Sequence, residues 1–91
     1  MRQAASVIDV RTRGKGLYEV TTEVERWVAA QAMTTGLLTL LCRHTSASLV
    51  IQENADPDVQ TDLEAYFERI APEDRAAYVH TLEGADDMPA H

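Results

Sequence analysis

The sequence predicts an α+β fold in which two helices lie on a mostly antiparallel sheet or sandwich. Strand-like and helix-like patterns alternate in the order strand, strand, helix, strand, strand, helix, strand. A continuous leucine-rich run at 37–41 is typical of a strand that is covered on both faces. The length of 91 residues supports one small domain, so we expect a single domain over 1–91.

The first two elements form a predicted hairpin. Residues 4–12 alternate between apolar and polar side chains, and 17–21 repeat this pattern. The segment Arg13-Gly14-Lys15-Gly16 between them has the glycines of a tight turn. It lacks the spacing of a phosphate-binding P-loop, so we interpret it as a turn only.

A helix is predicted next, over 23–34. Thr22 and Glu25 have the spacing of a capping box, and Trp27 lies on the apolar face that we expect to enter the core. Gly36 is expected to end this helix.

Two buried strands follow, at 37–41 and 47–51, and HTSAS at 44–48 connects them. Cys42 lies beside this apolar run and has no partner for an internal disulfide, which indicates a buried structural thiol in a reducing compartment.

The second helix has the clearest end signals. Asp56 is a natural N-cap, Pro57 suits the first helical position, and Pro72 cannot continue a helix. Apolar side chains recur along one face, so we expect a helix over 57–70. A short strand is predicted at 78–80 in the polar tail.

The charge distribution excludes some classes of partner. Residues 46–91 carry eleven Asp/Glu against two Lys/Arg, so no basic patch is available to bind nucleic acid. No apolar stretch reaches the length of about 20 residues that spans a bilayer, and the N-terminus has no signal core. We therefore expect a cytoplasmic protein that binds neither nucleic acid nor membrane.

Two histidines near the C-terminal end suggest a metal site. His80 and His91 are separated by Glu83, Asp86 and Asp87, which together offer nitrogen and oxygen ligands for a divalent ion such as Zn, Mn, Ni or Mg. The same segment contains glycine, proline and paired acids, so an ordinary solvated turn is the alternative.

The HTSAS connection offers a second polar group. A covalent serine mechanism with His44 is disfavoured, because no nucleophile elbow is present. The hydroxyls can instead donate to a phosphate or carboxylate, or simply satisfy the backbone of their own turn. Both interpretations, ligand binding and backbone satisfaction, remain open for Thr45, Ser46 and Ser48.

The motifs H-T-S-A-S, E-N-A-D-P and D-D-M-P-A-H occur in this order, with Y-V-H and L-E-G between the last two. In this respect the sequence resembles the YjbQ-like family, also called secondary thiamine-phosphate synthase enzymes. The resemblance is strong over the second half of the chain and extends to the first half as a pattern of hairpin, helix and strand.

The resemblance implies a trimer with a polar, metal-associated pocket near the subunit contacts. His80 and His91 match histidines of that pocket, and its other polar positions match His44, Glu53, Asn54 and Asp87. The implied reaction condenses hydroxymethylpyrimidine diphosphate with a thiazole phosphate to give thiamine phosphate and diphosphate. In this chemistry a divalent ion stabilises the leaving diphosphate, Thr45, Ser46 and Ser48 orient phosphate oxygens, and His44 shuttles a proton.

Relatives in this family continue beyond the D-D-M-P-A-H motif with a helix, further strands and another histidine. We therefore expect the domain to be incomplete at its C-terminus, the chain to be weakly active, and no helix to form at Pro89 and His91. The alternatives to an enzyme are a non-catalytic metal-binding or small-ligand-binding module and a purely structural oligomer.

Overall fold

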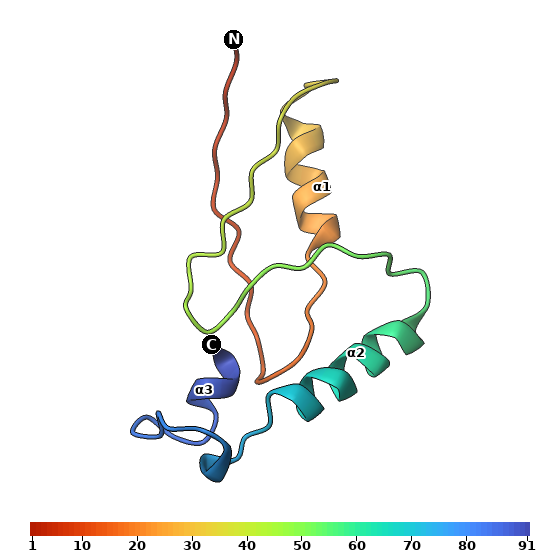
Figure 1. The fold of residues 1–91 in the computed structure, drawn as a ribbon. Coiled ribbons are helices and arrows are strands. Elements are labelled where there is room, and N and C mark those ends of the chain that lie inside the picture. Colours follow the sequence, from red (N-terminus) through yellow and green to blue (C-terminus); the bar gives the residue numbers. More distant parts are fainter. The chain divides into compact units, whose positions relative to one another are not determined.

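The computed structural model describes residues 1–91 and contains three α-helices and one 3-10 turn (Figure 1). The α-helices are α1 (Thr21–Ala30), α2 (Pro57–Ile70) and α3 (Asp87–Ala90), and the 3-10 turn η1 spans Arg75–Ala77. The chain divides into two compact units, 1–39 and 40–91. Each unit is described separately below.

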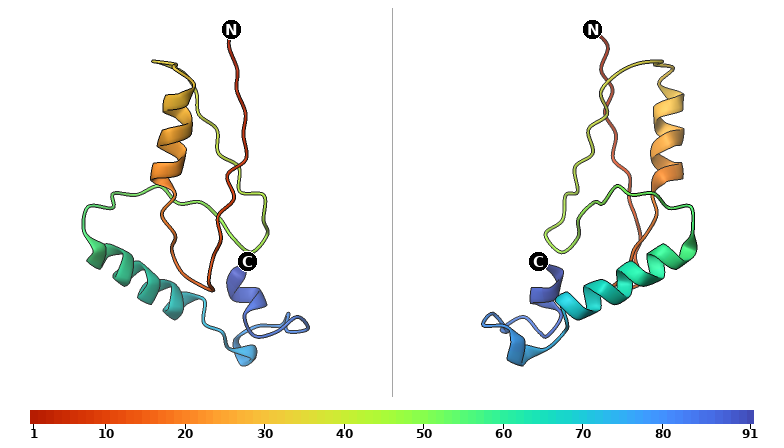
Figure 2. Two further views of the ribbon diagram at one scale, coloured as in Figure 1. Left: turned by 180° about the vertical axis from the view of Figure 1, so that it is seen from behind. Right: turned by 45° about the vertical axis from the view of Figure 1, so that its right-hand side comes forward.

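The predicted α+β sheet is wrong, because the structure contains no β-strand. The segments 4–12, 17–21, 37–41, 47–51 and 78–80 carry no strand, and the two further views in Figure 2 show irregular chain between the helices. A strand exists only as part of a ladder of backbone hydrogen bonds to a neighbour. The apolar patterns are present in these segments, but no such ladder joins them.

The predicted hydrophobic core is also absent. No residue is buried, and the side chains of the expected strands are among the most exposed: Leu37 is 93% exposed, Leu41 81% and Ile51 95%. Cys42 and Trp27 are only partly buried, which corrects the expectation that both lie in a core. Apolar side chains become buried only when a second layer covers them.

Helix α1 lies in the first unit and begins and ends earlier than predicted. Its N-cap is Val20, and no side chain caps it, so the predicted capping box does not form. At the other end the side-chain amide of Gln31 donates to the carbonyl of Trp27 at 3.0 Å. Ala32 then adopts a left-handed conformation with φ of 54°, which ends the helix before Gly36.

The predicted turn at 13–16 does occur, but a side chain closes it. The Tyr18 hydroxyl donates to the carbonyl of Gly14 at 2.7 Å and accepts from the backbone N–H of Arg13 at 2.9 Å. Gly14 has φ of 112°, a conformation that other residues rarely adopt. Local bonds thus form this turn without paired strands.

Helix α2 in the second unit has the predicted bounds. The Asp56 carboxylate accepts from the backbone N–H of Asp58 at 2.9 Å, and Pro57 begins the helix. The N–H of Ala71 donates to the carbonyl of Phe67 at 2.8 Å where the helix ends, one residue before Pro72.

The tail after α2 is built from turns. Asp74 caps η1 by accepting from the N–H of Ala76 at 3.0 Å. The last turn, α3, contains Pro89 and is followed by His91, which corrects the expectation that no helix forms at this motif. No helix in the chain combines the length and the apolar character needed to cross a membrane.

Replacing Asp56 with Ala should unfold the first turn of α2. The loss of an N-cap costs about 1 kcal/mol, and no buried core offsets that loss here. We expect faster amide hydrogen exchange at the start of α2 and lower helix content by circular dichroism. Asp56→Asn, which keeps an acceptor oxygen, should stay close to wild type. Equal exchange in Asp56→Ala and wild type would contradict this assignment of the cap.

Candidate metal centre

Three of the predicted site residues meet at the C-terminal end of the second unit. His80 lies in the loop after η1, Asp87 is the first residue of α3, and His91 follows the end of that helix. Asp87 and His91 are four residues apart across one helical turn, so their side chains lie on the same face.

One carboxylate oxygen lies close to both imidazoles. Asp87 Oδ2 is 2.8 Å from His80 Nε2 and 3.6 Å from His91 Nε2. The two rings have their centroids 6.5 Å apart and are inclined by 75°. Both Nε2 atoms therefore approach a common point beside Asp87.

The environment of Asp87 Oδ2 is unusual for a carboxylate. The atom is shielded from solvent, and His80 Nε2 is its ion-pair partner at 2.8 Å. A sheltered carboxylate oxygen needs a positive partner of this kind. Two donor atoms bound at about 2.1 Å to one cation lie about 3.0 Å apart at a right angle and about 3.4 Å apart at a tetrahedral angle. The distances of 2.8 Å and 3.6 Å are close to these two values.

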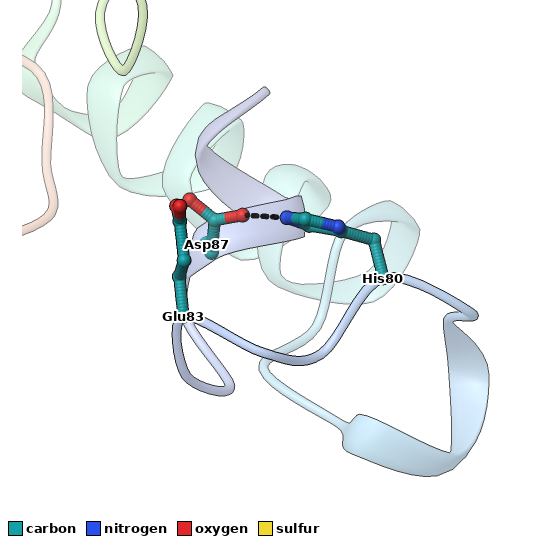
Figure 3. Close-up of side chains that lie close together, drawn as sticks. All are labelled: His80, Glu83 and Asp87. Carbon is teal, nitrogen blue, oxygen red and sulfur yellow. Dashed lines mark ion pairs between the residues drawn. The ribbon is translucent and has the colours of Figure 1, made fainter.

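The Glu83 carboxylate lies near this cluster. One ligand atom each from His80, Glu83 and Asp87 lie within 4.8 Å of one another. Figure 3 shows the Asp87 side chain between the other two, with its carboxylate turned toward the His80 ring and close to the Glu83 carboxylate. The sequence offers Glu83 among the oxygen donors between the two histidines, and the structure brings its carboxylate together with His80 and Asp87.

The residues present fit a divalent cation. Imidazole nitrogens suit Zn and Ni, whereas carboxylate oxygens suit Mg and Mn, so the mixed set is compatible with every ion expected from the sequence. The side chains of His80 and His91 are 48% and 47% exposed, whereas that of Asp87 is 14% exposed. The cluster thus has one sheltered oxygen and two imidazoles that solvent can reach.

The HTSAS connection forms a small turn of its own. The backbone N–H of Ser46 donates to His44 Nδ1 at 2.9 Å, and the Cys42 thiol donates to the carbonyl of Ala47 at 3.5 Å. The His44 ring and the Cys42 thiol therefore satisfy backbone groups of this turn.

The remaining predicted residues do not belong to the histidine cluster. The group that can hold a metal, His80, Glu83 and Asp87, includes neither His44 nor Glu53. A cavity in the first unit is lined by Met1–Gln3 and by Ala32–Leu37, so it contains none of the predicted site residues. The predicted residues that are exposed to solvent are Thr45, Ser46, Ser48, Glu53 and Asn54.

Comparison with known proteins identifies relatives across nearly the whole chain. The family model described as UPF0047 protein YjbQ-like matches residues 6–91. The UPF0047 protein sll1880 of Synechocystis sp. is 49% identical over 90 residues, which is 99% of this chain and 61% of that protein. The UPF0047 protein YjbQ of Salmonella typhimurium is 45% identical over 85 residues, covering 92% of this chain and 61% of the relative.

A more distant relative, the UPF0047 protein YugU of Bacillus subtilis, is 36% identical over 61 residues, covering 67% of this chain and 46% of that protein. No solved structure matches the chain. The names of these relatives give a family and no activity, and the chain spans about three-fifths of the length of the first two. The family match and these identities establish that the chain belongs to the UPF0047 YjbQ-like family.

Proposed function

We propose that this chain carries the cation-binding part of a metal-assisted site for phosphorylated heterocycles. The observation that supports the proposal is the approach of His80 Nε2 and His91 Nε2 to the same sheltered oxygen of Asp87. In this proposal His80, His91 and Asp87 hold a divalent ion, which is Zn, Mg, Mn or Ni.

The proposed reaction is the condensation that gives thiamine phosphate. The bond between the pyrimidine methylene carbon and the diphosphate oxygen breaks, and the diphosphate leaves with the electron pair. The lone pair of the thiazole ring nitrogen then forms the new carbon–nitrogen bond. A bound divalent cation supplies Lewis-acid stabilisation of the negative charge on the leaving diphosphate.

The charge of the second half of the chain makes a cation important for such a substrate. Residues 46–91 contain eleven Asp/Glu and two Lys/Arg, so the protein by itself repels a diphosphate. His80 and His91 bind the cation through their Nε2 atoms, and Asp87 balances its charge from the sheltered side.

The HTSAS turn is proposed to handle phosphate and protons. The exposed hydroxyls of Thr45, Ser46 and Ser48 are free to rotate toward phosphate oxygens. His44 Nδ1 accepts from the Ser46 N–H, so the neutral ring carries its proton on Nε2, from where it can pass to a substrate. Glu53 and Asn54 are proposed to line the same pocket.

A homotrimer is part of the proposal. The chain exposes large apolar side chains along both segments that the sequence predicts as buried, including Leu41 and Ile51. Exposed apolar area of this kind favours association with other chains.

The alternative is a binding module without catalysis. The openness of the cluster favours it, because His80 and His91 are about half exposed and reactive intermediates need shelter from water. Such a module holds a cation and a phosphorylated ligand through the same residues but does not turn the ligand over.

Removing either histidine should weaken metal binding. For His80→Ala and His91→Ala we expect affinity for Zn2+ to fall by more than about tenfold, because each loses a direct ligand. Isothermal titration calorimetry measures this affinity. His44→Ala is the matched control, since it removes a histidine outside the cluster and should bind Zn2+ as the wild type does. Wild-type affinity in both cluster variants would contradict the proposed site.

Turnover separates the enzyme from the binding module. We expect the metal-loaded chain to form thiamine phosphate and diphosphate from the two phosphorylated substrates, and His91→Ala to lose this formation. Product analysis by mass spectrometry checks it. Tight binding of thiamine phosphate without any product would support the module instead.

Association of the chain should depend on its exposed apolar residues. We expect sedimentation velocity to detect a trimer whose fraction increases with protein concentration. The double variant Leu41→Asp, Ile51→Asp should shift the chain toward monomer, because each change places a charge on an apolar contact surface. Replacing the polar exposed residue Gln52 with Asp is the control. A wild-type chain that remains monomeric at all concentrations would contradict the trimer.

A further inference from the structure

We propose that Glu83 is a ligand of the same cation, so that the site uses two carboxylates. This inference rests on the proposed cation site and adds to it Glu83, which the proposed ligand set of His80, His91 and Asp87 does not contain. The observation behind it is that the ligand atoms of His80, Glu83 and Asp87 lie within 4.8 Å of one another.

The arrangement of the two carboxylates favours a cation between them. The carboxylates of Glu83 and Asp87 lie close together in Figure 3, and the Asp87 oxygen that pairs with His80 at 2.8 Å is shielded from solvent. Two carboxylates at this separation repel each other. A divalent ion removes the repulsion, and the span of 4.8 Å needs only a small movement of exposed side chains to reach bonding distances.

Two overlapping ligand sets result, and they differ in the ion that they prefer. Both contain His80 and Asp87. The third ligand is the carboxylate of Glu83 in one set and the imidazole of His91 in the other. Carboxylate ligands suit Mn2+ and Mg2+, whereas imidazole ligands suit Zn2+ and Ni2+. Glu83 therefore raises the affinity for Mn2+ more than that for Zn2+. His91 raises the affinity for Zn2+ more than that for Mn2+.

Gly84 explains how Glu83 reaches the cluster. Its φ is 117°, which side-chain-bearing residues rarely adopt, and a Cβ at this position would lie 3.0 Å from Asp86 Oδ1. The N–H of Gly84 closes the turn by donating to the carbonyl of Thr81 at 3.4 Å. Glu83 lies inside this turn, and Asp87 follows as the first residue of α3.

The test measures Mn2+ and Zn2+ binding to the 91-residue chain and three variants. Mn2+ is followed by electron paramagnetic resonance, which detects the loss of the free-ion signal, and Zn2+ by calorimetry. Glu83→Gln removes the proposed ligand. Asp86→Asn is the matched control. The sequence offers Asp86 as a donor, but the structure leaves it outside the group of His80, Glu83 and Asp87; it is exposed, caps no N–H through its side chain, and the change removes the same charge. Gly84→Ala keeps every ligand but disturbs the turn.

We expect Glu83→Gln to weaken Mn2+ binding by about tenfold to 100-fold and Zn2+ binding by less, with Asp86→Asn close to wild type. Gly84→Ala should follow Glu83→Gln. Wild-type Mn2+ affinity in either Glu83→Gln or Gly84→Ala overturns the role of Glu83, and so does an equal loss in Asp86→Asn. These outcomes are distinct from failure of the site itself, in which His80→Ala binds both ions as the wild type does.

Discussion

The local chemistry of the second unit depends on Asp87. Its Oδ2 atom is shielded from water and lies 2.8 Å from the Nε2 atom of His80 and 3.6 Å from that of His91. A carboxylate oxygen in this position needs a positive partner, which either a protonated histidine or a bound cation provides. The 3-10 turn, the Gly84 turn and the single turn of α3 together bring the three side chains to this point. The proposed metal chemistry therefore rests on how one short segment folds back on itself.

Local hydrogen bonds, rather than burial, define the helices and turns. Asp56 and Asp74 each cap a helical segment, Tyr18 closes the turn at Gly14, and Gln31 covers a carbonyl at the end of α1. No side chain is buried in either unit. Elements held in this way open at low free-energy cost, because each bond competes with water. A cation that joins His80, Asp87 and His91 would add a cross-link where none of these bonds acts.

Structural elements that depend on residues close together in the sequence could be predicted from it. Elements that depend on pairing with a distant segment could not. Helix α2 has its predicted bounds because Asp56, Pro57 and Pro72 act on neighbouring backbone groups. The strands are absent because a run such as 37–41 reports the environment of a paired strand and does not create the pair. The separation of His80 and His91 in the sequence suggested a shared ligand set, and the two rings do lie beside one carboxylate. The sequence also offers Glu83 as an oxygen donor between the histidines, and the structure brings its ligand atom within 4.8 Å of those of His80 and Asp87.

The most direct test of the proposed cation site is the 15N spectrum of the histidine side chains during a titration with Zn2+. We predict that the Nε2 resonances of His80 and His91 shift together and reach their end points at one equivalent of Zn2+, because both nitrogens face one oxygen and bind one ion. The resonances of His44 should not follow them. If the Nε2 resonances of His80 and His91 stay in place, or respond independently at different Zn2+ concentrations, a shared cation site at Asp87 is contradicted.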